Sequence, residues 1–172
     1  MGTDLAAASS GLDDGLPDHA LADEQGNAVM MWRHLFDGGV RDHAMAKVGT
    51  NETTPKIHRA SFGNWKIDAC PHHGPALAKG GDWGYHMAWF DGGDKAGLFY
   101  ARMDGEAWVS SPAKRFGDAN SQAGHPALLS DGEQVWLAWK EFTPEGQLKY
   151  QFLETVVNLR PFYLLRSIGG SL

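Results

Sequence analysis

Short apolar runs separated by turns rich in Asp and Gly dominate the middle of this chain. Between Cys70 and Val109 the pattern predicts strands at Pro75–Ala78, Tyr85–Phe90 and Leu98–Arg102, with a fourth strand around Trp108. Aromatic and apolar runs joined by Asp/Gly turns are typical of an antiparallel meander. Four strands cannot bury both faces of their sheet by themselves. This unit therefore needs neighbouring sheets.

The same pattern occurs three times along the chain. Each copy begins with a His, continues with a short apolar run and ends on a Trp, as in the segments His19–Trp32, His73–Trp89 and His125–Trp139. The closing tryptophans are 57 and 50 residues apart. Phe36-Asp37-Gly38-Gly39 also recurs as Phe90-Asp91-Gly92-Gly93. A period near 50 in strand-forming sequence predicts the four-stranded blades of a β-propeller.

The repeats divide the 172-residue chain, which is long enough for one domain. We predict a flexible lead-in at 1–18, three blades at about 19–67, 68–118 and 119–154, and a non-repeat tail at 155–172. The lead-in is rich in Ala, Ser, Gly and Asp. Two interpretations of the tail stay open: it covers a sheet edge, or it is foreign sequence at the end of a truncated gene.

Composition supports the β class and excludes several functions. Seven Trp and 22 Gly favour a turn-rich β protein. A net charge of −6 argues against a general binder of nucleic acid or of anionic membranes. The single Cys70 excludes an internal disulfide. Residues 1–18 lack the basic start and apolar core of a signal peptide, so the chain as written is expected to be cytoplasmic.

Several segments taken together resemble a known family. They are Trp65, Cys70–Leu77, Ala88–Phe90, Phe99–Arg102 and Gly124–Leu128. As a set they resemble bacterial sialidase-like β-propeller proteins with BNR repeats, over roughly residues 19–150, a family that is often exported. Asp104-Gly105 and Trp108 keep part of that family's Asp-box, Ser-x-Asp-x-Gly-x-x-Trp, which stabilises a hairpin.

The resemblance implies six blades, whereas this chain holds about three. It also implies that catalytic members use three arginines for the substrate carboxylate, a Tyr nucleophile paired with Glu, and an Asp acid/base. The Phe/Tyr-Arg-Ile-Pro motif and the later blades are absent from this sequence. Arg41 and Asp42 form the pair that we place near such a catalytic site. We therefore do not expect one copy of the chain to be a catalytic sialidase.

Three histidines occupy equivalent positions in the repeats, just before the first strand. His19, His73 and His125 would face a common axis, because the first strand of a propeller blade is innermost. They could ligate zinc or copper there, with His72 and Cys70 as further donors. We favour the alternative that each His hydrogen-bonds a neighbouring blade, and on that interpretation no cofactor is needed.

Other residues suit a sugar ligand. The guanidinium group of Arg33 or Arg41 matches the carboxylate of a sugar acid, although a surface ion pair with Asp42 is the simpler explanation. Tyr85, like other aromatic side chains here, could stack on a sugar or fill the space between blades. As candidate substrate-binding residues we select Arg33, His72, His73, His125 and Tyr85.

The sequence therefore predicts an all-β, sialidase-like partial propeller of about three four-stranded antiparallel blades that interacts with carbohydrate without catalysis. One alternative is a metal-binding or glycoside-hydrolase enzyme whose axial His/Arg/Asp site is shared by a dimer. Another is a structural, self-assembling fragment without a ligand. Three blades leave two bare faces, so we expect a homodimer that closes a ring of six blades.

Overall fold

A computed structural model describes residues 19–49, 54–68, 73–156 and 165–167, with residues 152–156 and 165–167 described by their backbone only. Within these residues every regular element is a strand, and no helix occurs. The strands form three antiparallel four-stranded sheets, each in sequence order. The expected all-β fold of a partial propeller is confirmed. The described part of the chain contains no helix long and apolar enough to cross a membrane.

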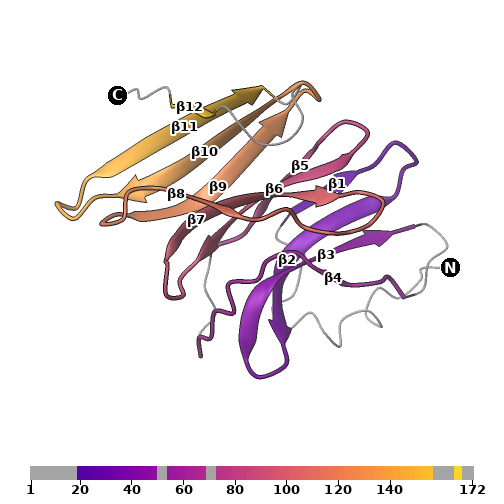
Figure 1. Cartoon of the computed structure of the whole chain (residues 1–172), viewed down its shortest axis with the longest axis horizontal. Helices are drawn as coiled ribbons and strands as arrows, with labels where there is room; N and C mark the ends of the chain where they lie inside the picture. The colour runs from indigo at the N-terminus through magenta and orange to yellow at the C-terminus, as the bar shows by residue number, and fades with distance from the viewer. Residues whose placement is uncertain (1–18, 50–53, 69–72, 157–164, 168–172) are drawn as a thin grey trace, which may run out of the picture.

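Figure 1 shows the second sheet lying between the first and the third. The first sheet contains β1 (His19–Ala22), β2 (Ala28–Phe36), β3 (Val40–Val48) and β4 (His58–Arg59). The second contains β5 (Ala76–Lys79), β6 (Gly84–Asp91), β7 (Gly97–Asp104) and β8 (Lys114–Phe116). The third contains β9 (Gln122–Ser130), β10 (Gln134–Phe142), β11 (Leu148–Val156) and β12 (Leu165–Ser167).

Side chains alternate along the strands of the second sheet and therefore point to both of its faces. Both faces are buried, because the first sheet covers one and the third sheet covers the other. Met87 and Trp89 of β6 face the first sheet, where they pack against Met31 and other apolar side chains. Ala88, between them, faces the third sheet and shares a cluster with Leu137 and Trp139. The core therefore consists of two apolar layers, one on each side of the second sheet.

The repeated Phe-Asp-Gly-Gly motif has two different structural roles. Between β2 and β3, Gly38 and Gly39 have φ angles of 75° and 77°, the left-handed conformation that tight hairpins require and glycine adopts readily. After β6, a Cβ added to Gly92 would lie 2.5 Å from the ring of Trp65. Glycine is needed in the first motif for its conformation and in the second for space.

The predicted fourth strand around Trp108 is wrong. The fourth strand is β8, and Trp108 lies in the turn after β7 with a φ of 56°. The cause is Asp104, whose Oδ1 accepts hydrogen bonds from the backbone N–H groups of Glu106 and Ala107 at 2.9 and 2.6 Å. Such an Asp-centred turn ends the strand. The ring of Trp108 stacks on His58 instead, with 4.6 Å between centroids.

Part of the C-terminal segment that we expected to lie outside the repeats belongs to the third sheet. Strand β12 pairs antiparallel with β11, with Leu153 opposite Ser167 and Thr155 opposite Leu165. It covers the edge of β11, and both interpretations of the tail as a whole stay predictions. The expected lead-in at 1–18, and residues 157–164 and 168–172 of the tail, lie outside the described residues.

We predict that Trp89→Ala lowers the free energy of unfolding by about 3–5 kcal/mol, because it empties a large site between two sheets. The Trp89 side chain is only 2% exposed. Trp136, which is half-buried on the outer face of the third sheet, provides the matched control, and Trp136→Ala should cost roughly 1 kcal/mol or less. Urea unfolding of both variants measures the difference. Equal midpoints for the two variants would contradict this account of the core.

The homodimer stays a prediction, and the third sheet offers a surface for it. Four large apolar side chains on its outer face are 43–65% exposed, namely Leu129, Phe142, Leu148 and Tyr150. Exposed apolar groups that gather on one face favour association. Light scattering should give twice the 18.7 kDa chain mass, and Phe142→Asp should shift the protein toward the monomer. A folded monomer at micromolar concentration would contradict the prediction.

Candidate functional site

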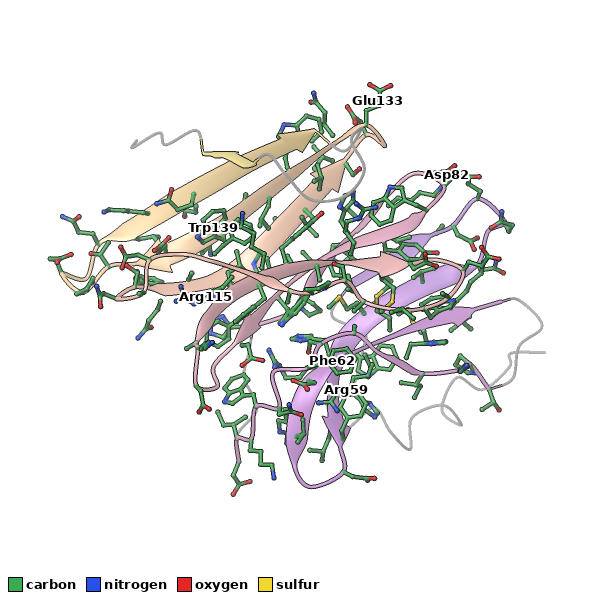
Figure 2. All side chains as sticks on the ribbon, in the orientation of Figure 1. Arg59, Phe62, Asp82, Arg115, Glu133 and Trp139 are labelled. Atoms are coloured by element: carbon green, nitrogen blue, oxygen red, sulfur yellow. The ribbon has the colours of Figure 1, made fainter. Side chains whose placement is uncertain are left out.

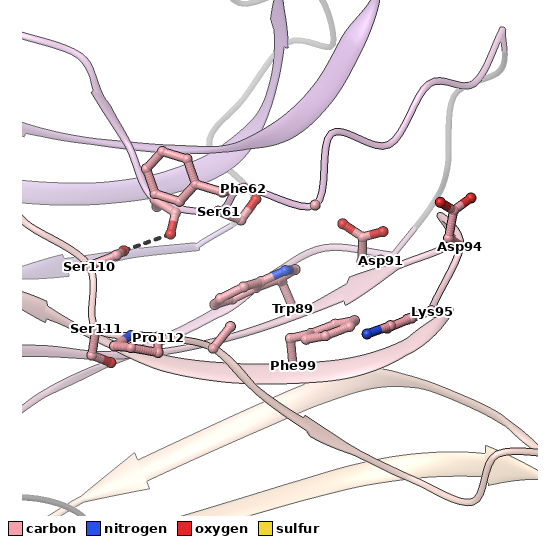
Figure 3. A pocket seen from close by; sticks show the side chains of 13 residues that line it. Ser61, Phe62, Trp89, Asp91, Asp94, Lys95, Phe99, Ser110, Ser111 and Pro112 are labelled. Atoms are coloured by element: carbon pink, nitrogen blue, oxygen red, sulfur yellow. Dashed lines mark hydrogen bonds between the residues drawn. The ribbon is translucent and has the colours of Figure 1, made fainter.

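A cavity of about 600 Å³ opens between the first and second sheets. Its walls come from three segments: residues 60–63 after β4, the end of β6 with its hairpin to β7, and residues 110–113 before β8. Figure 3 shows these segments surrounding the cavity. Residues from two sheets thus line one site, and its geometry depends on how the sheets pack.

Two aromatic side chains form the apolar side of the cavity. Trp89 of β6 and Phe99 of β7 are directly opposite in register, so their rings lie on the same face of the second sheet. The rings are stacked, with centroids 6.1 Å apart and an angle of 17° between their planes. Trp89 is buried and Phe99 half-buried. Phe62, 62% exposed, lies on the opposite wall.

Asp91, at the end of β6, brings a carboxyl group into this wall. Its residue is 5% exposed, and its Oδ1 accepts a hydrogen bond from the backbone N–H of Gly93 at 2.9 Å. Within the described part of the chain, Oδ2 receives no hydrogen bond. A Cβ on Gly63 would lie 2.0 Å from Oδ2, so this position must be glycine to leave room for the carboxyl group.

The electrostatic surroundings of Asp91 disfavour its charged form. Burial raises the pKa of Asp91 above its ordinary value, and the nearby Asp42 carboxylate raises it further. The hydrogen bond from Gly93 and the charge of Arg33 lower that pKa and oppose the rise only in part. Asp91 is therefore a carboxyl group whose ionisation carries an energetic cost in the folded protein.

Arg59 positions residues 60–63, which form the cavity wall opposite Trp89 and Phe99. Its guanidinium group forms an ion pair with the buried Asp42 and donates to Asn64 Oδ1 at 2.7 Å. Its Nε donates to the carbonyl oxygen of Ser61 at 3.0 Å. The same guanidinium group lies 5.1 Å from the centre of the Phe62 ring, and Figure 2 shows the two side chains together beside the first sheet.

Two serines connect this wall to its surroundings. Ser61 Oγ accepts a hydrogen bond from the backbone N–H of His43 in β3 at 2.8 Å. Ser110, which comes from the second sheet's side, donates its hydroxyl to the carbonyl oxygen of Ala60 at 2.7 Å, the bond drawn in Figure 3. The cavity walls are therefore held in place without a ligand.

Arg33 and Arg41, the arginines that the sequence suggested as site residues, both donate hydrogen bonds to backbone carbonyl groups. Arg33 is buried and donates to the carbonyl oxygens of Arg41 and Phe90 at 2.9 and 2.8 Å, so it links the first sheet to the second. Its guanidinium group also lies 4.9 Å from the Trp65 ring. Arg41 is half-buried and donates from Nε to the carbonyl oxygen of Ile67 at 3.3 Å. A catalytic role for Arg41 and Asp42 stays a prediction.

Two of the three repeat histidines meet. The rings of His73 and His125 have centroids 4.5 Å apart. Among the described residues, no three His, Cys, Asp or Glu side chains are grouped so that they could hold a metal ion, so His19 does not complete a site with this pair. Cys70 and His72 lie outside the described residues. Zinc or copper binding stays a prediction.

Tyr85, which we expected to bind substrate, packs in the apolar layer between the first and second sheets, and its residue is 7% exposed. Sequence reasoning in turn missed Asp91, Phe99 and Ser61 as cavity residues. The recurrence of Phe-Asp-Gly-Gly drew attention to Asp91, but only as a turn residue. Nothing in the sequence placed Gly63 beside the Asp91 carboxyl group, because that contact joins two sheets.

Sequence comparison does not assign the chain to a family. No family profile matches it. A curated relative, the cytochrome c oxidase subunit 1 homolog (bacteroid) of Bradyrhizobium diazoefficiens, is 47% identical over 46 residues. That match covers 27% of this chain and 8% of the relative.

Structural comparison shows a shared fold. The xylan β-1,4-xylosidase from Bacillus halodurans C-125 superimposes with a TM-score of 0.52 at 16% identity, covering 86% of this chain and 32% of the xylosidase. This chain thus spans about a third of that protein. A thermostable family-43 glycoside hydrolase gives a TM-score of 0.49 at 14% identity, with 89% of this chain and 57% of the hydrolase covered. A fucose lectin from Kordia zhangzhouensis, in complex with methyl-fucoside, gives a TM-score of 0.47 at 11% identity. The superposition covers 89% of this chain and 98% of the lectin. The sialidase-like family itself stays a prediction.

We predict that Asp91→Asn raises the free energy of unfolding at neutral pH. Because the pKa of Asp91 is raised in the folded protein, the folded state holds more protons than the unfolded state between the unfolded and folded pKa values. Stability therefore falls as pH rises through that window and stays lower above it. Asparagine keeps the Oδ1 acceptor and does not ionise, so it avoids this loss.

Thermal unfolding at about pH 3 and about pH 7 tests this sign, since the difference between variant and parent should vanish at the lower pH. Asp104→Asn is the matched control with the opposite sign, because backbone hydrogen bonds from Ala107 and Glu106 lower the pKa of Asp104. An Asp91→Asn protein that is less stable than the parent at neutral pH would show that burial does not dominate at this carboxyl group.

Proposed function

We propose that this chain is a glycan-interacting module of propeller type, and that glycans bind in the cavity between the first and second sheets. The observation that carries the proposal is the pairing of stacked aromatic rings, Trp89 and Phe99, with a buried carboxyl group at Asp91. A sugar ring has apolar C–H faces and a polar hydroxyl rim. Its apolar face can therefore pack against the half-exposed ring of Phe99, on which Trp89 is stacked, while its hydroxyl groups donate to the carboxylate.

The size and order of the cavity support this assignment. Its volume of about 600 Å³ falls within the ~300–1,000 Å³ range of small-molecule sites. The hydrogen bonds of Arg59 and Ser110 hold its walls before any ligand arrives. A preformed site saves the entropy of ordering side chains on binding, which otherwise weakens affinity.

The structural comparison supports the choice of carbohydrate among small ligands. The xylosidase that shares the fold is named for xylan, a polysaccharide. Sialic acid, the ligand class that the family resemblance implies, has less support from the arginines. Arg33 donates to two backbone carbonyl groups and Arg59 forms an ion pair with Asp42, so these guanidinium donors already have partners.

Hydrolysis of a glycoside is a second candidate, favoured by the raised pKa of Asp91. A carboxyl group that keeps its proton at higher pH is suited to protonate a leaving oxygen. Such a role would also need a second carboxylate, and Asp94 lines the same cavity. A non-catalytic role for a single chain remains the principal proposal.

We predict that Phe99→Ala weakens glycan binding by roughly 1 kcal/mol, about five-fold, because it removes half of the aromatic pair. Binding is measured by calorimetry against neutral, acidic and amine-bearing trisaccharides, and each mixture is analysed for released sugar to test hydrolysis. Ile57→Ala, at an exposed apolar residue outside the cavity lining, is the control and should bind as the parent does. If no saccharide of any class binds the parent protein, the proposed function is wrong.

A further inference from the structure

Charged side chains gather at one end of the cavity. Asp91, Asp94 and Lys95 all come from the end of β6 and its hairpin to β7, and Figure 3 shows them on the same side of the cavity. Their formal charges sum to −1 when both carboxyl groups are ionised. Lys95 is the only positively charged side chain among the described residues that line the cavity.

Arg33, whose charge also acts on Asp91, and Arg59 both have hydrogen-bond or ion-pair partners within the protein. The guanidinium group of Arg33 donates to the carbonyl oxygens of Arg41 and Phe90, and that of Arg59 pairs with Asp42. Meanwhile Asp91 is nine-tenths buried, its Oδ2 receives no hydrogen bond from the described residues, and its side chain lines the cavity. A carboxylate oxygen at the wall of a cavity can accept a hydrogen bond from a bound ligand.

We propose that the cavity selects glycans that carry a free amine, such as units of glucosamine, over N-acetylated and acidic glycans. This inference rests on the proposed function and specifies its ligand class. An ammonium group in the cavity could donate to Asp91 Oδ2, which receives no hydrogen bond from the described residues, and the charge of both groups would strengthen that bond. It could also lie over the half-exposed ring of Phe99, which lines the cavity, as cations do with aromatic rings.

The competing glycans lack one or both of these interactions. N-acetylation removes the charge and adds bulk at the atom that would face Asp91. A uronic or sialic acid would bring a carboxylate beside Asp91 and Asp94, and like charges at close range repel each other in a partly buried site. Lys95 is exposed, so its attraction for an acidic sugar is screened by solvent and salt.

The proposal also predicts how the affinity for an amine-bearing glycan changes with pH. The charged groups around Asp91 are Arg33 and Asp42 from the first sheet and Asp94 and Lys95 from its own hairpin. Since burial keeps Asp91 protonated to a higher pH than usual, affinity for the amine should rise as Asp91 ionises. It should fall again once the sugar amine loses its own proton. The Asp91→Asn protein should lack the lower-pH limb of this profile.

Calorimetry on the full chain, at low salt and mildly acidic pH, tests the selectivity with four probes. They are the trisaccharide of glucosamine, the same trisaccharide fully N-acetylated, a trisaccharide of galacturonic acid, and the non-sugar polyamine spermidine. We expect the glucosamine trisaccharide to bind at least about ten-fold more tightly than each of the others, as the loss of a hydrogen bond to a charged group implies. Its affinity should fall with added salt.

For three substitutions at the charged end of the cavity, the proposal predicts the direction in which glycan affinity changes. Asp91→Asn should weaken binding of the glucosamine trisaccharide about ten-fold and that of the N-acetylated probe by much less, because asparagine keeps an acceptor oxygen and loses only the charge. Asp94→Asn should weaken it roughly two- to five-fold, and Lys95→Gln should strengthen it by a similar factor, because both residues are exposed. Glu133→Gln, at the exposed turn between β9 and β10, is the matched control and should change nothing.

The outcomes separate this inference from the proposed function. Equal or tighter binding of the N-acetylated or galacturonic probe would overturn the amine selectivity and leave glycan binding intact. Spermidine binding as tightly as the glucosamine trisaccharide would show that the site responds to charge alone, and would also overturn the inference. If none of the saccharides binds, both proposals fail together. Because Asp94 and Lys95 are exposed, their variants test the charge at this end of the cavity independently of Asp91.

Discussion

Burial of both faces of the second sheet is the constraint on which the rest of this structure depends. A four-stranded sheet with apolar residues at successive positions cannot leave either face in water, so it requires a sheet on each side. Met87 and Trp89 supply the contact with the first sheet, and Ala88 and Leu98 supply the contact with the third. The small side chains at Ala76, Ala88 and Ala123 fill the second layer beside the larger Leu137 and Trp139.

Polar contacts then fix how the first sheet meets the second. Arg33 crosses between them, and burial of its guanidinium group is offset by hydrogen bonds to two backbone carbonyl oxygens. At the rim, Asp42 is buried against Arg59 and also accepts a hydrogen bond from the backbone N–H of Asn64 at 3.2 Å. Removal of either partner would leave a charge without compensation, which is more costly than the pair is stabilising. The rim segment 60–64, and hence the cavity wall, depends on these contacts.

The aspartates of this chain divide into two physical classes. Asp104 and Asp131 are exposed and accept hydrogen bonds from backbone N–H groups in turns, which lowers the pKa of each. Asp91 is likewise at the end of a strand, but it is buried and its pKa is raised. The first class stabilises turns. Ionisation of the second opposes folding, and such residues are typical of sites where a ligand or a reaction uses the charge.

The sequence by itself determined the all-β class, the three repeats and most strand positions. Alternating apolar residues and Asp/Gly turns are local signals, and they indicated β5, β6, β7 and the first two strands of each other sheet within a few residues, whereas β4 and β12 were not predicted. The same local signals misplaced the fourth strand at Trp108, because the hydrogen bonds of Asp104 end the strand first. The tertiary structure alone decided the site. Asp91, Gly63 and Ser110 are brought together by the packing of two sheets, as are His73 and His125 by the next pair, and contacts between distant segments leave no periodic signal in the chain.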